Sequence, residues 1–146
     1  MISLPLARQL KQAGLVWQAA MNDYFAIPDR GMDERVFVLA HMQAQLDLYR
    51  GWPVVTFHGT AEWALDYILT AEVIWLPREE QVRNVLLELL PAEGATGPVS
   101  LLVQNGHYVC TIPWRGSAKQ FDGSHGADAY GAALLFVLKN QSLQST

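Results

Sequence analysis

Two adjacent residues, Asn105 and Gly106, constrain the fold of this chain more than any other feature of its sequence. Val99 to Gln104 precedes them and His107 to Ile112 follows, and both segments are predominantly apolar. A two-residue type I′ turn needs positive φ at both central positions, and Asn-Gly is the pair that adopts it most readily. The sequence therefore predicts an antiparallel β-hairpin over residues 99–112.

Three other segments have the apolar spacing and the terminal residues of helices. The first is expected over about residues 3–13, where Ser3 can accept a hydrogen bond as the N-cap. The second begins at Pro77, a residue whose missing N–H costs nothing at a helix start. The third is expected over Ala127 to Lys139, which is mostly apolar.

Short apolar runs predict further strands. Tyr24 to Ile27 ends at a cluster of turn-forming residues, and Arg35 to Met42 is a second β-branched run. Tyr24 to Ile27 is almost without charge, and we expect it to be an edge strand whose backbone groups a second copy of the chain can pair. The stretch from Arg115 to Gly126 is polar and contains glycine and serine, and it precedes the last expected helix.

The segment from Trp52 to Ile68 allows two interpretations. It can be a helix capped by Thr60, or its second half, Ala61 to Ile68, can be a strand in which apolar and polar residues alternate. We favour a hairpin of this strand with Val54 to Phe57. Its loop should be the three residues His58 to Thr60, because an odd-numbered loop brings the apolar residues of both strands to one face.

These elements predict an α+β fold: a single domain over residues 1–140, with an antiparallel sheet of five or six strands packed with about three helices. The length of 146 residues is typical of one domain, and 51% of the residues are hydrophobic. We expect residues 141–146 to form a frayed tail.

Composition excludes several classes of function. The formal net charge is −4 and the basic residues are scattered, so we expect no nucleic-acid partner. Cys110 is the single cysteine and the four histidines are dispersed, so we expect no structural zinc. The sequence has no cofactor-binding motif and neither a signal peptide nor a membrane span, and it indicates no cofactor, no membrane partner and a cytoplasmic location.

Two groups of polar residues are candidate ligand-binding sites. Arg115 and Lys119, with Ser124 and His125 before the last helix, could attract an anion to the helix start, although a serine there is also an ordinary N-cap. The second group is His58, Glu62 and Asp66 on the proposed hairpin, which would suit a divalent metal or acid–base chemistry. Alternating acids are equally typical of a solvent-facing strand. The candidate residues are therefore His58, Glu62, Asp66, Arg115, Lys119, Ser124 and His125.

Two residue types outside these groups also bear on function. His107 and Cys110 lie three apart on a strand and so point to opposite faces, which makes Cys110 a buried apolar residue rather than a nucleophile. Among the five tryptophans, Trp52 and Trp114 each stand beside a proline at a strand end. We expect these two to be partly exposed.

The stretches Phe57 to Asp66, Trp75 to Arg83 and Leu6 to Leu15 resemble a group of small uncharacterised bacterial proteins, some of which carry the label "pilus assembly protein". The resemblance covers about the first two-thirds of the chain and implies no assigned activity. No functional residue is carried over from it.

The sequence is compatible with two functions. The first is a non-enzymatic protein-interaction or regulatory module that forms a homodimer, a hypothesis suggested by abundant aromatic residues and the lack of a catalytic motif. The alternative is a small enzyme or ligand-binding protein whose site is assembled from residues far apart in the chain.

Overall fold

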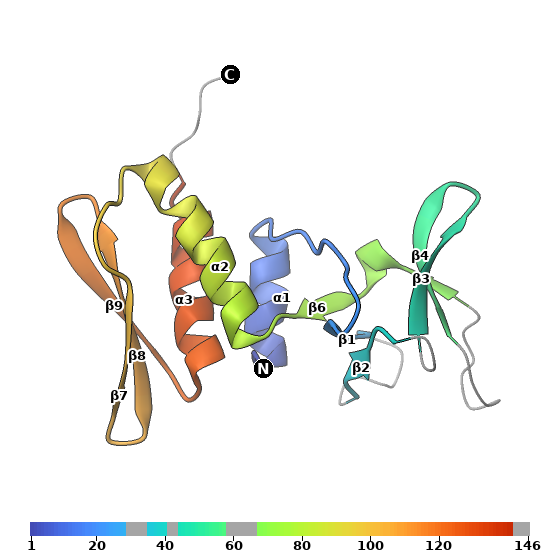
Figure 1. Cartoon of the computed structure of the whole chain (residues 1–146), viewed down its shortest axis with the longest axis horizontal. Helices are drawn as coiled ribbons and strands as arrows, with labels where there is room; N and C mark the ends of the chain where they lie inside the picture. The colour runs from blue at the N-terminus through green and yellow to red at the C-terminus, as the bar shows by residue number, and fades with distance from the viewer. Residues whose placement is uncertain (29–34, 41–43, 58–66, 142–146) are drawn as a thin grey trace. The chain divides into compact units, whose positions relative to one another are not determined.

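The computed structural model describes residues 1–28, 35–40, 44–57 and 67–141, and Figure 1 shows its elements. The described residues have an α+β architecture, as predicted, with three α-helices. The helices are α1 (Leu4–Gln12), α2 (Glu79–Leu89) and α3 (Gly126–Lys139), and two short 3-10 helices are η1 (Thr70–Glu72) and η2 (Pro91–Glu93). The strands are β1 (Tyr24–Ala26), β2 (Phe37–Val38), β3 (Ala44–Tyr49), β4 (Trp52–Phe57), β5 (Tyr67–Leu69), β6 (Ile74–Leu76), β7 (Ser100–Gln104), β8 (His107–Trp114) and β9 (Ser117–Gly123).

The strands form three antiparallel sheets of three strands each, in the orders β2-β1-β6, β3-β4-β5 and β7-β8-β9. The prediction of one sheet with five or six strands is therefore wrong. Strands β1, β2, β5 and β6 have only two or three residues each, and strands that short present too few backbone groups to continue a ladder far.

The chain divides into two compact units. Unit 1 is Met1–Leu15 with Pro77–Thr146, and unit 2 is Val16–Leu76, which in sequence is an insertion between α1 and α2. The interpretation of residues 1–140 as one domain stays a prediction. Of the expected tail, residues 142–146 lie outside the described residues.

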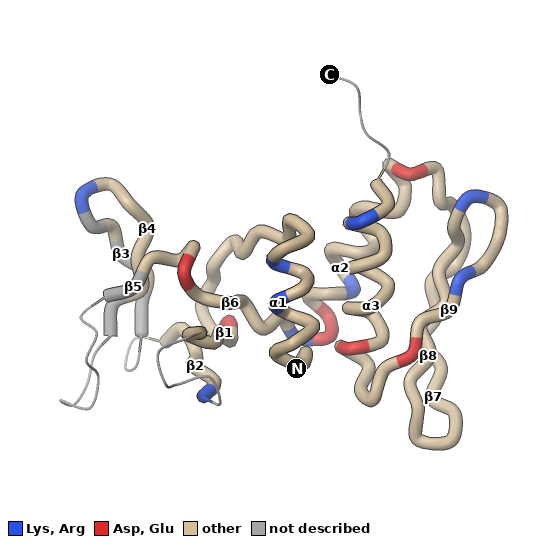
Figure 2. Tube along the Cα trace, turned by 180° about the vertical axis from the view of Figure 1, so that it is seen from behind, with Lys and Arg blue, Asp and Glu red and all other residues tan. Residues whose placement is uncertain are grey.

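Helix α3 is the centre of unit 1, because it packs against α1, α2, β8 and β9. A helix with neighbours on several sides needs apolar residues around much of its circumference, and only Asp128 and Lys139 in α3 are charged. Figure 2 shows these charges near the two ends of α3, where an acid at the N-terminus and a base at the C-terminus complement the helix dipole. The other elements of this core contribute Ala7, Leu10, Val82, Leu86, Cys110, Ile112 and Trp114.

Unit 2 has a separate apolar core. Asp23 is buried in this unit, and its carboxylate accepts hydrogen bonds from the indole of Trp17 at 2.9 Å and the backbone N–H of Ala20 at 3.0 Å. These bonds compensate for burying a charge. The aromatic ring of Phe25 packs against both Trp17 and Phe37, whose ring centroids are 5.6 and 5.5 Å away. The core cluster is Phe25, Ile27, Phe37, Leu39, Val55 and Val73.

The predicted hairpin at Asn105-Gly106 is confirmed. Strands β7 and β8 pair with Gln104 opposite His107, and φ is 52° at Asn105 and 76° at Gly106. Two turns of the same kind were not predicted. Positive φ at two successive residues also joins β3 to β4 at Arg50-Gly51 and β8 to β9 at Arg115-Gly116. Arginine is a much weaker signal for this backbone than asparagine, so β3 and β9 were not predicted.

The predicted register between β4 and the strand that follows it is wrong. A three-residue loop at 58–60 would pair Val55 with residue 63, whereas Val55 pairs with Ile68. Residues 58–66 lie outside the described residues, so the choice between helix and strand for 61–66 is not tested, while Tyr67–Leu69 is a strand. Alternation along one strand fixes which residues share a face but leaves the position of the partner strand open.

The expectation that Tyr24 to Ile27 is an edge strand is also wrong. Within this segment, β1 pairs with β2 on one side and with β6 on the other, so that Tyr24 faces both Val38 and Leu76. Its low charge reflects burial in the middle of a sheet. Among the described residues, no helix is long and apolar enough to cross a membrane.

Candidate functional site

Two residues of the expected anion site, Arg115 and Lys119, lie near the C-terminal end of α3. Arg115 lies in the β8–β9 turn, and its guanidinium donates a hydrogen bond to the backbone oxygen of Asn140 at 3.2 Å. The ammonium of Lys119, on β9, lies 5.4 Å from the ring centre of Phe136. Both cations therefore complement the negative end of the helix dipole rather than forming an open anion site.

Ser124 and His125 lie at the opposite end of the same helix. His125 is the N-cap of α3, but its side chain makes no capping hydrogen bond; its Nδ1 is 4.0 Å from an oxygen of Asp128 and its ring stacks on Tyr108 at 6.5 Å. Ser124 is exposed. A helix of 14 residues is about 21 Å long, so the structure does not bring these two residues together with Arg115 and Lys119.

The second candidate group cannot be placed. His58, Glu62 and Asp66 all lie outside the described residues, and their site stays a prediction. In the part of the chain that the structure describes, no group of three or more His, Cys, Asp and Glu side chains is arranged to hold a metal ion.

Cys110 and Trp114 are buried, whereas Trp52 is exposed. Cys110 is fully buried while His107 is exposed, so the assignment of Cys110 to the core is confirmed. Burial raises the pKa of the Cys110 thiol to about 11, which removes it as a nucleophile at neutral pH. Trp52 is 66% exposed, as expected, but Trp114 is only 5% exposed, because its ring packs edge-on against Phe136 at 5.2 Å.

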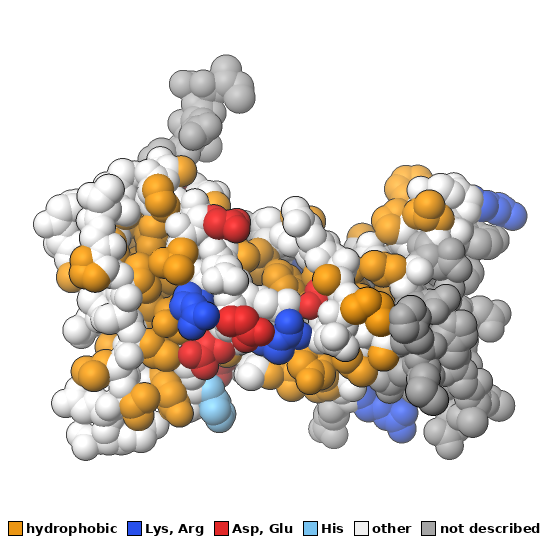
Figure 3. All heavy atoms as spheres, in the orientation of Figure 1, with side chains coloured by type: hydrophobic (Ala, Val, Ile, Leu, Met, Phe, Trp, Pro, Cys, Tyr) orange, Lys and Arg blue, Asp and Glu red, His pale blue; other side chains and the backbone are white. Residues whose placement is uncertain are grey.

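A polar cluster that the sequence analysis did not single out surrounds the start of α3. The backbone of Gly126 lies so close to Glu79 that a Cβ at this glycine would be 2.6 Å from a carboxylate oxygen. Glu79 thus adds a negative charge at the positive end of α3. Burial raises the pKa of the nearby Tyr130 hydroxyl, and a hydrogen bond from Arg83 acts in the opposite direction. Figure 3 shows acidic and basic side chains gathered around the start of α2.

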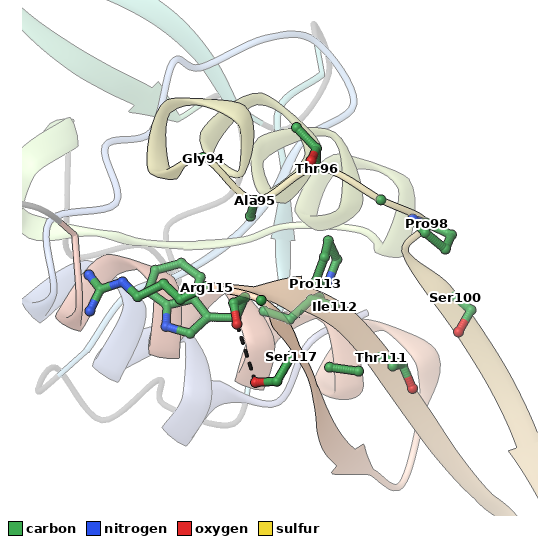
Figure 4. A pocket seen from close by; sticks show the side chains of 14 residues that line it. Gly94, Ala95, Thr96, Pro98, Ser100, Thr111, Ile112, Pro113, Arg115 and Ser117 are labelled. Carbon is green, nitrogen blue, oxygen red and sulfur yellow. Dashed lines mark hydrogen bonds between the residues drawn. The ribbon is translucent and has the colours of Figure 1, made fainter.

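A groove of about 580 Å³ lies beside the β8–β9 hairpin, against the segment from Gly94 to Pro98 (Figure 4). Its polar lining consists mainly of hydroxyl groups, from Thr96, Ser100, Thr111 and Ser117. The Ser117 hydroxyl donates to the carbonyl of Trp114 at 3.4 Å, and Figure 4 shows the Arg115 side chain extending away from Ser100 and Thr111. The groove has the volume of a small-molecule site but lacks converging charged groups.

Strand β7 offers a different kind of site, an uncharged sheet edge. Its residues Leu102 and Val103 are each 58% exposed although they point to opposite faces of the sheet. Strands β7 and β8 contain no Lys, Arg, Asp or Glu, and Figure 3 shows hydrophobic side chains in this part of the molecule. Edge strands usually carry charge or proline that blocks pairing, and β7 has neither.

Comparison of this chain with protein-family models, with curated proteins and with solved structures found no match. The local geometry of the chain is therefore the basis for its proposed function.

Proposed function

We propose that this chain is a non-enzymatic protein-interaction module of the bacterial cytoplasm that binds a partner strand along β7. The single observation that carries the proposal is the unprotected edge of β7, with two exposed aliphatic side chains and no charge. A sheet edge presents unpaired N–H and C=O groups, and an extended segment of another protein can satisfy them by adding a strand.

The side chains of β7 support this mode of binding. Leu101 is half-buried and Val103 exposed on the face toward α3, while Leu102 is exposed on the outer face. A partner strand would cover apolar surface on both faces of the sheet at once, since its own side chains alternate in the same way. Main-chain hydrogen bonds would supply affinity and the two faces would supply specificity.

Photo-crosslinking in the cytoplasm of the source cell tests the proposal. A photoreactive phenylalanine analogue at position 102 should give a covalent adduct with a protein. The matched control is position 120, an exposed site on the outer face of β9, the other edge strand of the same sheet, and it should give none. Val103→Lys should abolish the adduct at 102 because the lysine charge would have to be desolvated in the paired edge. A chain that gives no adduct at 102 contradicts the proposal.

The groove beside Gly94 to Pro98 favours a second candidate, a protein that binds a small neutral ligand. Hydroxyl groups from Thr96, Ser100 and Thr111 could orient such a ligand without a charged partner. Screening small polyols by amide chemical shifts would test this candidate: shifts confined to the groove support it, and an unchanged spectrum counts against it.

A further inference from the structure

We infer that the strand that pairs with β7 is β7 of a second copy, in an antiparallel arrangement centred on Leu102. The inference rests on the proposed function and names its partner. It assembles one six-stranded sheet from two three-stranded ones, with the strand order β9-β8-β7 continuing into β7-β8-β9 of the second copy.

The register of the hairpin sets which backbone groups of β7 are available. Gln104 and His107 flank the two-residue turn, and in such a hairpin this flanking pair exchanges both hydrogen bonds. Hydrogen-bonded pairs alternate along an antiparallel ladder, so Leu102 and Ser100 also turn their backbone groups toward β8. The N–H and C=O groups of Leu101 and Val103 consequently point to the free edge.

A two-fold axis beside Leu102 uses all four of these groups. It places Leu101 of each copy opposite Val103 of the other, in pairs that exchange both hydrogen bonds, and it makes four backbone hydrogen bonds between the copies. Leu102 then faces Leu102 of the second copy in a non-hydrogen-bonded pair, in which the Cα atoms are about 4.5 Å apart.

The side chains are complementary in the same arrangement. On the outer face, Leu102 already lies beside Val109 of β8, and the pairing would continue this row as Val109, Leu102, Leu102 and Val109 across the two copies. On the inner face, Leu101 would contact Val103 of the second copy. No charged residue lies between Ser100 and Trp114, so like charges do not oppose each other where the copies meet.

The surface buried between the two copies would be small, so we expect their association to be weak. Five residues per strand bury less than the roughly 1,200 Å² of a standard stable interface, so the association should be reversible at micromolar concentration. The exposed aliphatic pair and the absence of charge favour pairing, while the short strand limits it.

Cysteine crosslinking tests the register. The variant Leu102→Cys should form an intermolecular disulfide under mild oxidation, because the two Cα atoms would lie within the 4.4–6.8 Å that a disulfide spans. Gln120→Cys, exposed on the other edge strand, is the matched control and should crosslink at least tenfold more slowly. The native Cys110 is buried and is present in both variants, so it adds the same background to each.

Sedimentation of the unmodified chain supplies the second measurement. Its mass should rise from 16.3 kDa toward twice that value between low and high micromolar concentration, and Val103→Lys should remain at 16.3 kDa while keeping the far-ultraviolet circular dichroism of the original chain. Equal crosslinking rates for the two cysteine variants, or a constant mass of 16.3 kDa, would overturn the inference.

The two proposals fail in different ways. A photo-adduct at position 102 with a different protein, from a chain that stays monomeric, leaves the interaction module standing and refutes the second copy. A dimer without the position-102 disulfide places self-association on another surface and refutes the β7 register. No adduct and no dimer refute both proposals.

Discussion

Gly106 shows how one residue determines a local structure. Its φ of 76° is unfavourable for a side chain with a Cβ, although the space around it is open, so only the backbone resists substitution. Gly106→Val should lower the free energy of unfolding by about 1–3 kcal/mol, measured by denaturant titration. Gly106→Asn is the control and should cost less, because asparagine tolerates positive φ. A loss below a few tenths of a kcal/mol for the valine variant would contradict the turn assignment.

Cys110 gives the chain a predictable response to alkaline pH. The thiol has a pKa of about 11 in the folded state, raised by burial from the ordinary 9.0. Between these values the unfolded chain loses the thiol proton and the folded chain keeps it. The unfolded state then binds fewer protons, so stability should be unaffected by this group below pH 9 and should fall as the pH rises from 9 to 11.

The measurement is the difference in pH dependence between the original chain and Cys110→Ala, since other groups that titrate in this range are common to both. The original chain should lose on the order of 2 kcal/mol more than the variant over this interval. Parallel curves for the two chains would show that the thiol is not protected from ionisation by burial.

At the scale of elements, the contact between β9 and α3 depends on Gly123. A Cβ at this glycine would meet the backbone nitrogen of Ala129 and lie 2.9 Å from the carbonyl carbon of Asp128. Backbone atoms of a helix cannot move aside as a flexible side chain can, so Gly123→Ala should force β9 away from α3 and cost about 1–3 kcal/mol of stability.

Asp122→Ala is the matched control for this contact, because Asp122 is exposed and adjacent in the same strand. Its effect on the unfolding free energy should stay within about 0.5 kcal/mol. If Gly123→Ala is as mild as the control, the close packing of β9 on α3 is wrong.

At the scale of the whole molecule, unit 2 is an insertion whose removal should leave unit 1 folded. Unit 1 contains three helices and the β7-β8-β9 sheet, and unit 2 contains a core of its own. Within unit 1, the N–H of Ile2 donates to the carbonyl of Pro77 at 3.4 Å, so Pro77 lies at the start of α1 and Leu15 beyond its end. Helix α1 has nine residues and is about 14 Å long, so a replacement linker must span roughly that length along the helix.

A flexible Gly/Ser linker of about 12 residues has a root-mean-square span of about 19 Å and should suffice in place of Val16–Leu76. The shortened chain should unfold cooperatively in denaturant and keep the amide chemical shifts of β7 to β9. An unfolded product would instead support the prediction of a single cooperative domain over residues 1–140.

The sequence by itself determined the features that depend on neighbours in the chain. The presence of the three helices follows from apolar spacing, although Ser3 makes no capping hydrogen bond and α2 begins at Glu79 rather than at Pro77. The Asn105-Gly106 hairpin follows from the φ angles that those two residues accept. The burial of Cys110 and the exposure of His107 follow from the alternation of a strand.

Only the tertiary structure decided how these elements pair and which residues meet. Strands β1 and β7 both lack charged residues, but β1 has a partner on each side whereas β7 has a free edge. The composition of a strand does not reveal how many partner strands it has, because the partners come from other parts of the chain. Trp114 is buried by Phe136, and α3 separates Arg115 from His125 by its full length. These relations join residues distant in sequence, and local propensity and periodicity contain no information about such distances.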